Sequence, residues 1–245
     1  MKNKLKYTDS SQYWRQRANR PGQKSVMWRN ECFNNLFRQE QRKLLLELFK
    51  DDIDKPLQIL EYGCGIGVFC HLLIEIFPNA NITGIDFPEM INVARKRNHH
   101  SRITYIASSA EDHNASRETY DIIISSGCIS AIMNQTLHDI IFQNMQTMIK
   151  PNGKILFIDP FHKYKPLSRV PVSSKKIINK MKFLNFKLVY YSGLSFWPTR
   201  ILIANSSFND NIVSCVFVAG EKVLSILGRK IWSDYKVLLF NHVQK

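Results

Sequence analysis

An acidic residue followed by three alternate glycines marks the part of this chain best suited to binding a ligand. Residues 57–62 predict a short buried strand that reaches the acidic Glu61, and residues 67–77 predict the helix after it. The turn between them carries Gly63, Gly65 and Gly67. Glycine lets main-chain N–H groups approach a ligand closely, and the dipole of the following helix favours an anion there. The turn therefore predicts a cofactor cradle.

The spacing of the glycines argues against a dinucleotide site. A dinucleotide fingerprint, G-x-G-x-x-G, needs a third glycine five residues after the first, and that position is Val68. Asp86 follows Gly67 by 19 residues, at the end of a second predicted strand over 82–86. An acid at such a strand tip can accept hydrogen bonds from both hydroxyls of a ribose. The two strand tips predict a site for a nucleoside-containing cofactor.

Five segments resemble, in this order, those of class I S-adenosylmethionine-dependent methyltransferases. They are EYGCGIG, GIDFP, YIASSAEDHN, YDIIISSGCIS and MIKPNGKILFIDP, and the resemblance extends over about residues 57 to 160. A strand-to-helix turn that binds nothing would explain the glycines alone, but it would leave Asp86 and the later strand tips as coincidence. The ordered set is therefore far more specific than the glycine turn.

The resemblance implies that the cofactor is S-adenosyl-L-methionine (AdoMet). It places the methionine arm against Glu61 and the glycine turn, the ribose against Asp86, and the adenine near residues 109–111. The residues expected to contact the cofactor are Tyr13, Glu61, Gly63, Cys64, Gly65, Gly67, Asp86, Phe87, Ser109, Ala110, Glu111, Ser126 and Gly127. Ser109 stands where family members often have aspartate, so an adenine contact there would use a hydroxyl. The five cysteines include no C-x-x-C pair, and no metal site is predicted.

The alternation of elements predicts an α/β fold. We expect a Rossmann-like, doubly wound, mostly parallel seven-stranded sheet with helices on both faces. Residues 1–50 predict an N-terminal helical cap of the same domain, and residues 51–245 predict the AdoMet-binding domain. An insertion before the last strand, around 193–232, is expected to cover the substrate. Residues 151–153, Pro-Asn-Gly, predict a turn into the fifth strand.

The charge is uneven along the chain. The formal net charge is +14, with +8 on residues 1–50, −5 on residues 51–150 and +11 on residues 151–245. Basic ends favour an anionic partner: a small molecule, an anionic membrane face or RNA. Basic residues within 163–169 are expected to contact such a substrate. No apolar stretch reaches the ~18 residues of a membrane span, and the first residues lack a signal-peptide pattern, so a cytoplasmic protein is expected.

These features predict methyl transfer from AdoMet to a small-molecule acceptor, on oxygen or nitrogen, in specialised or cell-envelope metabolism. The tip of the fourth strand, residues 125–128, reads Ser-Ser-Gly-Cys and lacks the Asn/Asp-Pro-Pro-Tyr/Phe box common in nucleobase amino methyltransferases. His162, just after the fifth strand, is the candidate general base, with a structural loop histidine as the alternative. An RNA methyltransferase and a non-catalytic AdoMet-fold scaffold remain open, as does the oligomeric state.

Overall fold

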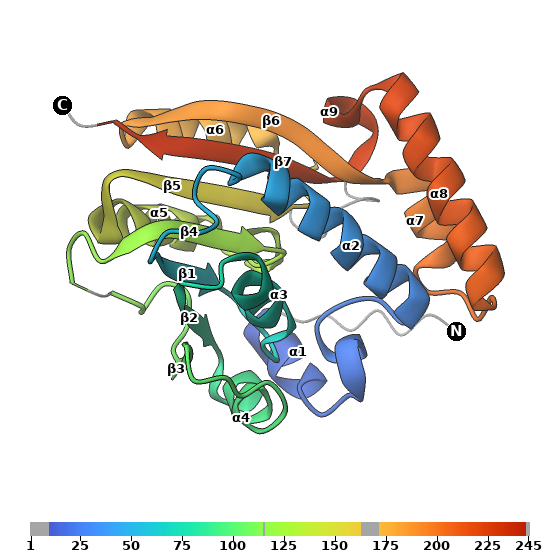
Figure 1. Cartoon of the computed structure of the whole chain (residues 1–245), viewed down its shortest axis with the longest axis horizontal. Coiled ribbons are helices and arrows are strands. Elements are labelled where there is room, and N and C mark those ends of the chain that lie inside the picture. The colour runs from blue at the N-terminus through green and yellow to red at the C-terminus, as the bar shows by residue number, and fades with distance from the viewer. Residues whose placement is uncertain (1–9, 115, 163–171, 244–245) are drawn as a thin grey trace.

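A seven-stranded mixed sheet runs through the computed structural model, which describes residues 10–114, 116–162 and 172–243 (Figure 1). The strand order is β3-β2-β1-β4-β5-β7-β6, and β7 is antiparallel to both of its neighbours while the other pairs are parallel. The strands are β1 Gln58–Tyr62, β2 Asn81–Asp86, β3 Ile103–Ala107, β4 Tyr120–Ser126, β5 Ile149–Asp159, β6 Phe186–Phe196 and β7 Ser233–His242. The predicted Rossmann-like, mostly parallel sheet is confirmed. The basic residues expected at 163–169 lie outside the described residues.

Helices cover both faces of the sheet because successive strand residues point to opposite sides. Leu156 packs into a core layer with α2, α3, α4, α7 and α8, whereas its neighbour Phe157 packs into a second layer with α5 and α6 (Figure 1). The first layer contains α2 Glu31–Leu48, α3 Val68–Ile76, α4 Pro88–Arg97, α7 Trp197–Ile203 and α8 Asp210–Leu227. The second contains α5 Gln135–Met148 and α6 Ser174–Phe183. The central strands β1, β4 and β5 are therefore apolar on both faces.

The strand order reverses between β1 and β4, and this reversal positions the site. The chain leaves β1 for α3 in one layer, whereas β4 leads through the short 3-10 helix η2, Ile129–Ala131, to α5 in the other. The two connections diverge at the carboxyl ends of these neighbouring strands. In open α/β sheets such a divergence leaves the crevice in which ligands bind.

The N-terminal segment contains α1 Ser10–Arg17, the 3-10 helix η1 Gly22–Ser25 and α2. Asn30 caps α2, because its Oδ1 accepts a hydrogen bond from the backbone N–H of Phe33 at 2.9 Å. Arg15 joins α1 to α4 through an ion pair with Glu89 at 3.1 Å, and its guanidinium lies 4.5 Å from the Phe87 ring centre. The segment expected to cap the sheet thus packs at its carboxyl edge.

Two parts of the C-terminal half refine the sequence prediction. The turn expected at 151–153 is wrong, because β5 runs through these residues. They form an irregularity of the strand, where its pairing with β4 jumps from Ile149–Tyr120 to Lys154–Ile122 and Asn152 has a φ of 60°. The insertion between β6 and β7 consists of α7, α8 and α9, Arg229–Trp232. Within the described ranges, none of the helices is both long enough and apolar enough to cross a membrane.

Candidate active site

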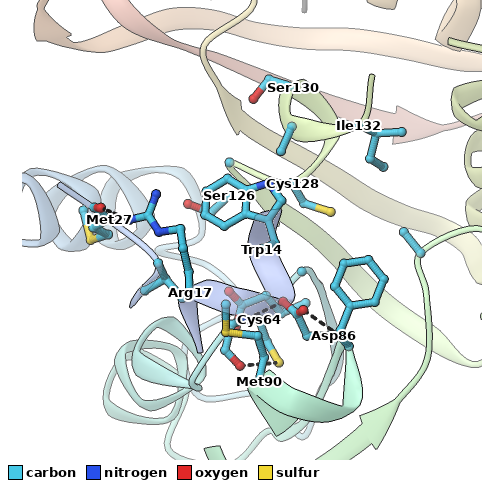
Figure 2. Close-up of a pocket in the computed structure, with 18 of the residues that line it drawn as sticks. Trp14, Arg17, Met27, Cys64, Asp86, Met90, Ser126, Cys128, Ser130 and Ile132 are labelled. Carbon is cyan, nitrogen blue, oxygen red and sulfur yellow. Dashed lines mark hydrogen bonds between the residues drawn. The ribbon is translucent and has the colours of Figure 1, made fainter. Parts of the chain in front are cut away.

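A cavity of about 340 Å³ lies at the carboxyl ends of β1, β2 and β4. Figure 2 shows side chains from α1 (Trp14, Arg17), the turn after β1 (Cys64), the tip of β2 (Asp86) and the tip of β4 (Ser126) around it. Of the residues predicted to contact the cofactor, those that line it are Tyr13, Glu61, Gly63, Cys64, Gly65, Asp86, Phe87, Ser109, Ala110, Glu111, Ser126 and Gly127. Gly67 and His162 do not line it.

The glycine turn presents main chain to this cavity. Gly63 and Gly65 have φ angles of 69° and 55°, a conformation that side-chain-bearing residues adopt at a cost. A Cβ atom on Gly65 would lie 2.3 Å from Cγ1 of Val26, in the N-terminal segment that covers the turn. Gly67 serves a different purpose, since it caps α3 and a Cβ there would meet the Tyr105 hydroxyl at 2.2 Å. The first two glycines line the cavity, and the third shapes the entry into α3.

Asp86 is fixed at the tip of β2 by two backbone hydrogen bonds. Its Oδ2 accepts from the N–H of Gly65 at 2.8 Å and its Oδ1 accepts from the N–H of Phe87 at 2.7 Å. Each carboxylate oxygen keeps a further lone pair, which can accept a ribose hydroxyl. Burial raises the pKa of Asp86 to about 6. Hydrogen bonds from a ligand would stabilise its ionised form.

Asp86→Ala is expected to weaken binding of AdoMet by roughly 10- to 150-fold, the equivalent of 1.5–3 kcal/mol for hydrogen bonds to a charged group. Titration calorimetry with AdoMet and its demethylated product measures this loss, and Asp139→Ala, at the surface of α5 and outside the cavity, is the control. An unchanged affinity in Asp86→Ala would mean that the ribose binds elsewhere.

Glu61 is a buried carboxyl group in the same cavity. Its Oε2 accepts a hydrogen bond from Sγ of Cys70 at 2.9 Å, and the side chain is only 2% exposed. Burial raises the pKa of Glu61 to about 7, although the positive charge of Arg38 opposes this shift. A carboxyl group in this state gains a full negative charge when a cationic group binds beside it.

The raised pKa of Glu61 predicts a pH-dependent stability of the ligand-free protein. The unfolded chain releases this proton near pH 4.5 and the folded chain near 7, so the folded state holds more protons between these values. The free energy of unfolding should therefore fall as the pH rises through this range, by up to roughly 3 kcal/mol from Glu61. Urea denaturation at several pH values should show a flatter profile for Glu61→Gln. Identical profiles would contradict the prediction.

The N-terminal segment forms the cover of the cavity. Arg17 Nη2 donates to the carbonyl oxygens of Lys24 at 2.7 Å and Met27 at 2.5 Å, and its guanidinium lies 4.9 Å from the Trp14 ring centre (Figure 2). These contacts tie α1 to the stretch 26–28, which also lines the cavity. The sequence predicted Tyr13 as part of this site but gave no sign of Arg17.

The other end of the cavity lies between α2, α7 and the start of β7, and we call it the acceptor end. Its apolar lining is Trp28, Phe37, Ala131, Ile132, Met133 and Pro160, and its polar lining is Ser130, Arg200, Asp234 and Tyr235, whereas Arg38 faces Glu61 at the cofactor end. Arg200 donates to both carboxylate oxygens of Asp234, from Nε at 2.9 Å and from Nη2 at 2.8 Å. Burial raises the pKa of Tyr235, so its hydroxyl stays protonated. The sequence does not predict the residues of the acceptor end. A nearby sign of a polar site is that α2 buries two polar residues, Asn34 and Gln41, on its apolar face.

His162 lies beside the acceptor end and outside the cavity. Its side chain is 6% exposed, and Nε2 donates to the carbonyl oxygen of Asp234 at 2.6 Å. The ring is buried and does not line the cavity, so neither of its nitrogens is placed to reach an acceptor hydroxyl there. The geometry therefore does not support the role of general base.

We expect His162→Gln to leave the pH profile of methyl transfer unchanged and to lower the melting temperature by roughly 2–10 °C, because a buried hydrogen bond is lost. Thermal unfolding and pH-rate measurements separate the two effects. A loss of activity by a factor of 100 at unchanged melting temperature would restore the catalytic assignment.

Comparison with known proteins identifies the class. Residues 53–209 match the family described as "Methyltransferase domain", and the chain belongs to this family. It is similar to malonyl-[acyl-carrier protein] O-methyltransferase 2 of Ilyobacter polytropus, with 32% identity over 114 residues that cover 46% of this chain and 42% of the relative. The corresponding enzyme of Halalkalibacterium halodurans is 28% identical over 153 residues, covering 59% and 55%. The matches span about half the length of these relatives.

The fold is also that of a solved structure. N-methyltransferase NodS from Bradyrhizobium japonicum, in complex with S-adenosyl-L-homocysteine, superposes with a TM-score of 0.64 at 15% identity, covering 96% of this chain and all of that one. The predicted class I methyltransferase fold and its cofactor, AdoMet, are confirmed. The described residues contain no cluster of three or more His, Cys, Asp or Glu side chains that could hold a metal ion.

Proposed function

We propose that this protein transfers a methyl group from AdoMet to an oxygen of a small anionic acceptor. When bound, AdoMet supplies an electrophilic methyl group on a sulfonium. The protein's part is to hold the acceptor oxygen in line behind that methyl and to exclude water. The cavity suits this task because its cofactor end, with Glu61 and Asp86, continues past the tip of β4 into the acceptor end.

The residues at the acceptor end favour an oxygen atom as the methyl acceptor. The described residues that line the cavity include no histidine and no lysine, and burial keeps the Tyr235 hydroxyl protonated. An oxygen that must first lose a proton would need a base at this end, and the Asp234 carboxylate there is already bound through both oxygens by Arg200. A carboxylate oxygen is already ionised at neutral pH and needs none. The similarity to proteins named malonyl-[acyl-carrier protein] O-methyltransferases supports this acceptor class.

The stability of the methylated product in base tests the proposal. Protein is incubated with AdoMet tritiated on the methyl group and with a panel of a malonyl thioester, fatty acids, phenols and primary amines. Methyl esters release volatile labelled methanol in mild alkali, whereas methyl ethers and methylamines keep the label. We expect label transfer to carboxylates, with a base-labile product. Transfer only to phenols or amines would contradict the carboxylate assignment.

Salt dependence tests the remaining RNA alternative, which depends on the basic ends of the chain. Binding to several phosphates gives a linear fall of log affinity with log salt, with a slope near 0.7 per contact on single strands. Filter binding of bulk RNA across salt concentrations measures this slope. We expect binding to vanish at physiological salt; saturable binding there that competes with methyl transfer would favour RNA as the acceptor.

A further inference from the structure

Two opposite charges face the cofactor end of the cavity from neighbouring positions. The Arg38 guanidinium lies 5.2 Å from the ring centre of Phe69, and the Glu61 carboxyl accepts a hydrogen bond from Cys70, the next residue of α3. Arg38 and Glu61 both line the cavity, and their charges interact, yet no ion pair within 4.0 Å joins them. Together they present one positive and one negative group to a ligand.

The position of Arg38 is fixed from α2. Its Nη1 donates to Oε1 of Gln41 at 2.8 Å, and Nε2 of Gln41 donates to Oγ of Ser126 at 3.0 Å. This chain of hydrogen bonds holds the guanidinium next to the tip of β4. Gln41 is fully buried, so these hydrogen bonds are shielded from water.

Arg38 also has a hydrogen-bond donor to spare. Its Nε is buried and has no partner among the described residues. Burial lowers the pKa of Arg38, which shows that the charge is poorly solvated. An unsatisfied buried donor on a charged group is costly, and an anionic ligand group would remove that cost.

We propose that Arg38 binds the α-carboxylate of the cofactor's methionine arm while Glu61 faces its α-ammonium group. An amino acid carries these two opposite charges on one carbon, which matches the paired charges of Arg38 and Glu61. Arg200, the arginine at the acceptor end, already donates to both oxygens of Asp234. The inference rests on the AdoMet site and does not depend on the nature of the acceptor.

Calorimetry with three ligands tests the assignment. S-adenosyl-L-homocysteine has the complete amino acid arm, its decarboxylated analogue lacks only the carboxylate, and 5′-methylthioadenosine lacks the whole arm. Native protein should bind the complete ligand roughly 10- to 150-fold more tightly than the decarboxylated one, as expected for hydrogen bonds to a charged group. Arg38→Met should abolish this difference and leave the affinity for 5′-methylthioadenosine within twofold.

Two further variants serve as controls. Arg42→Met lies one turn further along α2, where Arg42 pairs with Glu75 at the surface, and it should bind all three ligands as the native protein does. Arg38→Lys keeps the charge and should recover part of the preference for the carboxylate. If Arg38→Met fails to fold, native protein and Arg38→Lys still decide the question.

Three results would overturn the inference. Native protein could bind the complete and decarboxylated ligands equally; Arg38→Met could weaken all three ligands alike; or it could leave all three unchanged while raising the KM of the acceptor, which would assign Arg38 to the acceptor. The affinities for the three ligands are measured without methyl transfer. A base-stable product would therefore contradict the proposed carboxylate acceptor, but it would not affect the assignment of Arg38 to the cofactor carboxylate.

Discussion

Gly65→Val should weaken binding of S-adenosyl-L-homocysteine by roughly 30- to 1,000-fold, the equivalent of about 2–4 kcal/mol. Two causes add. Gly65 has a φ of 55°, and a left-handed conformation costs roughly 1–2 kcal/mol for a residue with a side chain. The new Cβ would also lie 2.3 Å from Val26, so the cover over the turn must move, at a further cost of about 1–3 kcal/mol. Calorimetry measures the affinity.

Gly228→Val is the matched control for backbone strain. Gly228 has a φ of 100°, but a Cβ there would meet nothing within 4 Å, and the residue does not line the cavity. This variant should lose stability and keep its affinity. Full affinity in folded Gly65→Val would show that the turn is not the cradle of the cofactor.

The cofactor end could be predicted from sequence because its signals are local. Gly63 and Gly65 reveal a turn by their spacing, and Asp86 follows at the end of one apolar segment. Parallel strands bring their carboxyl ends to one edge, so residues at successive strand ends meet without further information. The mostly parallel sheet follows from the same alternation of strands and helices.

The acceptor end could not be predicted in this way. It combines Trp28 and Phe37 with Arg200 and Tyr235, which are distant in sequence and meet only because α2 and α7 pack in one layer beside the start of β7. The same contacts explain His162. It does follow β5, as predicted, but the antiparallel neighbour β7 brings the Asp234 carbonyl to its ring. A sequence position can place a residue at an edge, whereas its partners depend on tertiary packing.

Arg200→Met is expected to lower the free energy of unfolding by about 3–5 kcal/mol, because it leaves the Asp234 carboxylate buried without its main partner. Asp234 is 1% exposed and receives two hydrogen bonds from this guanidinium, which also lies 4.8 Å from the Trp28 ring centre. For a chain of this size the melting temperature should fall by roughly 6–20 °C. Urea denaturation followed by circular dichroism measures the loss.

Arg42→Met is the control here as well, because the Arg42 and Glu75 side chains are 42% and 60% exposed and their ion pair should contribute about 1 kcal/mol or less. An equal loss in both variants would mean that Asp234 is satisfied by other groups. Arg200→Met combined with Asp234→Asn should recover part of the stability, since the buried charge is removed together with its partner. Because Arg200 and Asp234 line the acceptor end, the double variant should keep its affinity for S-adenosyl-L-homocysteine while its KM for the acceptor changes.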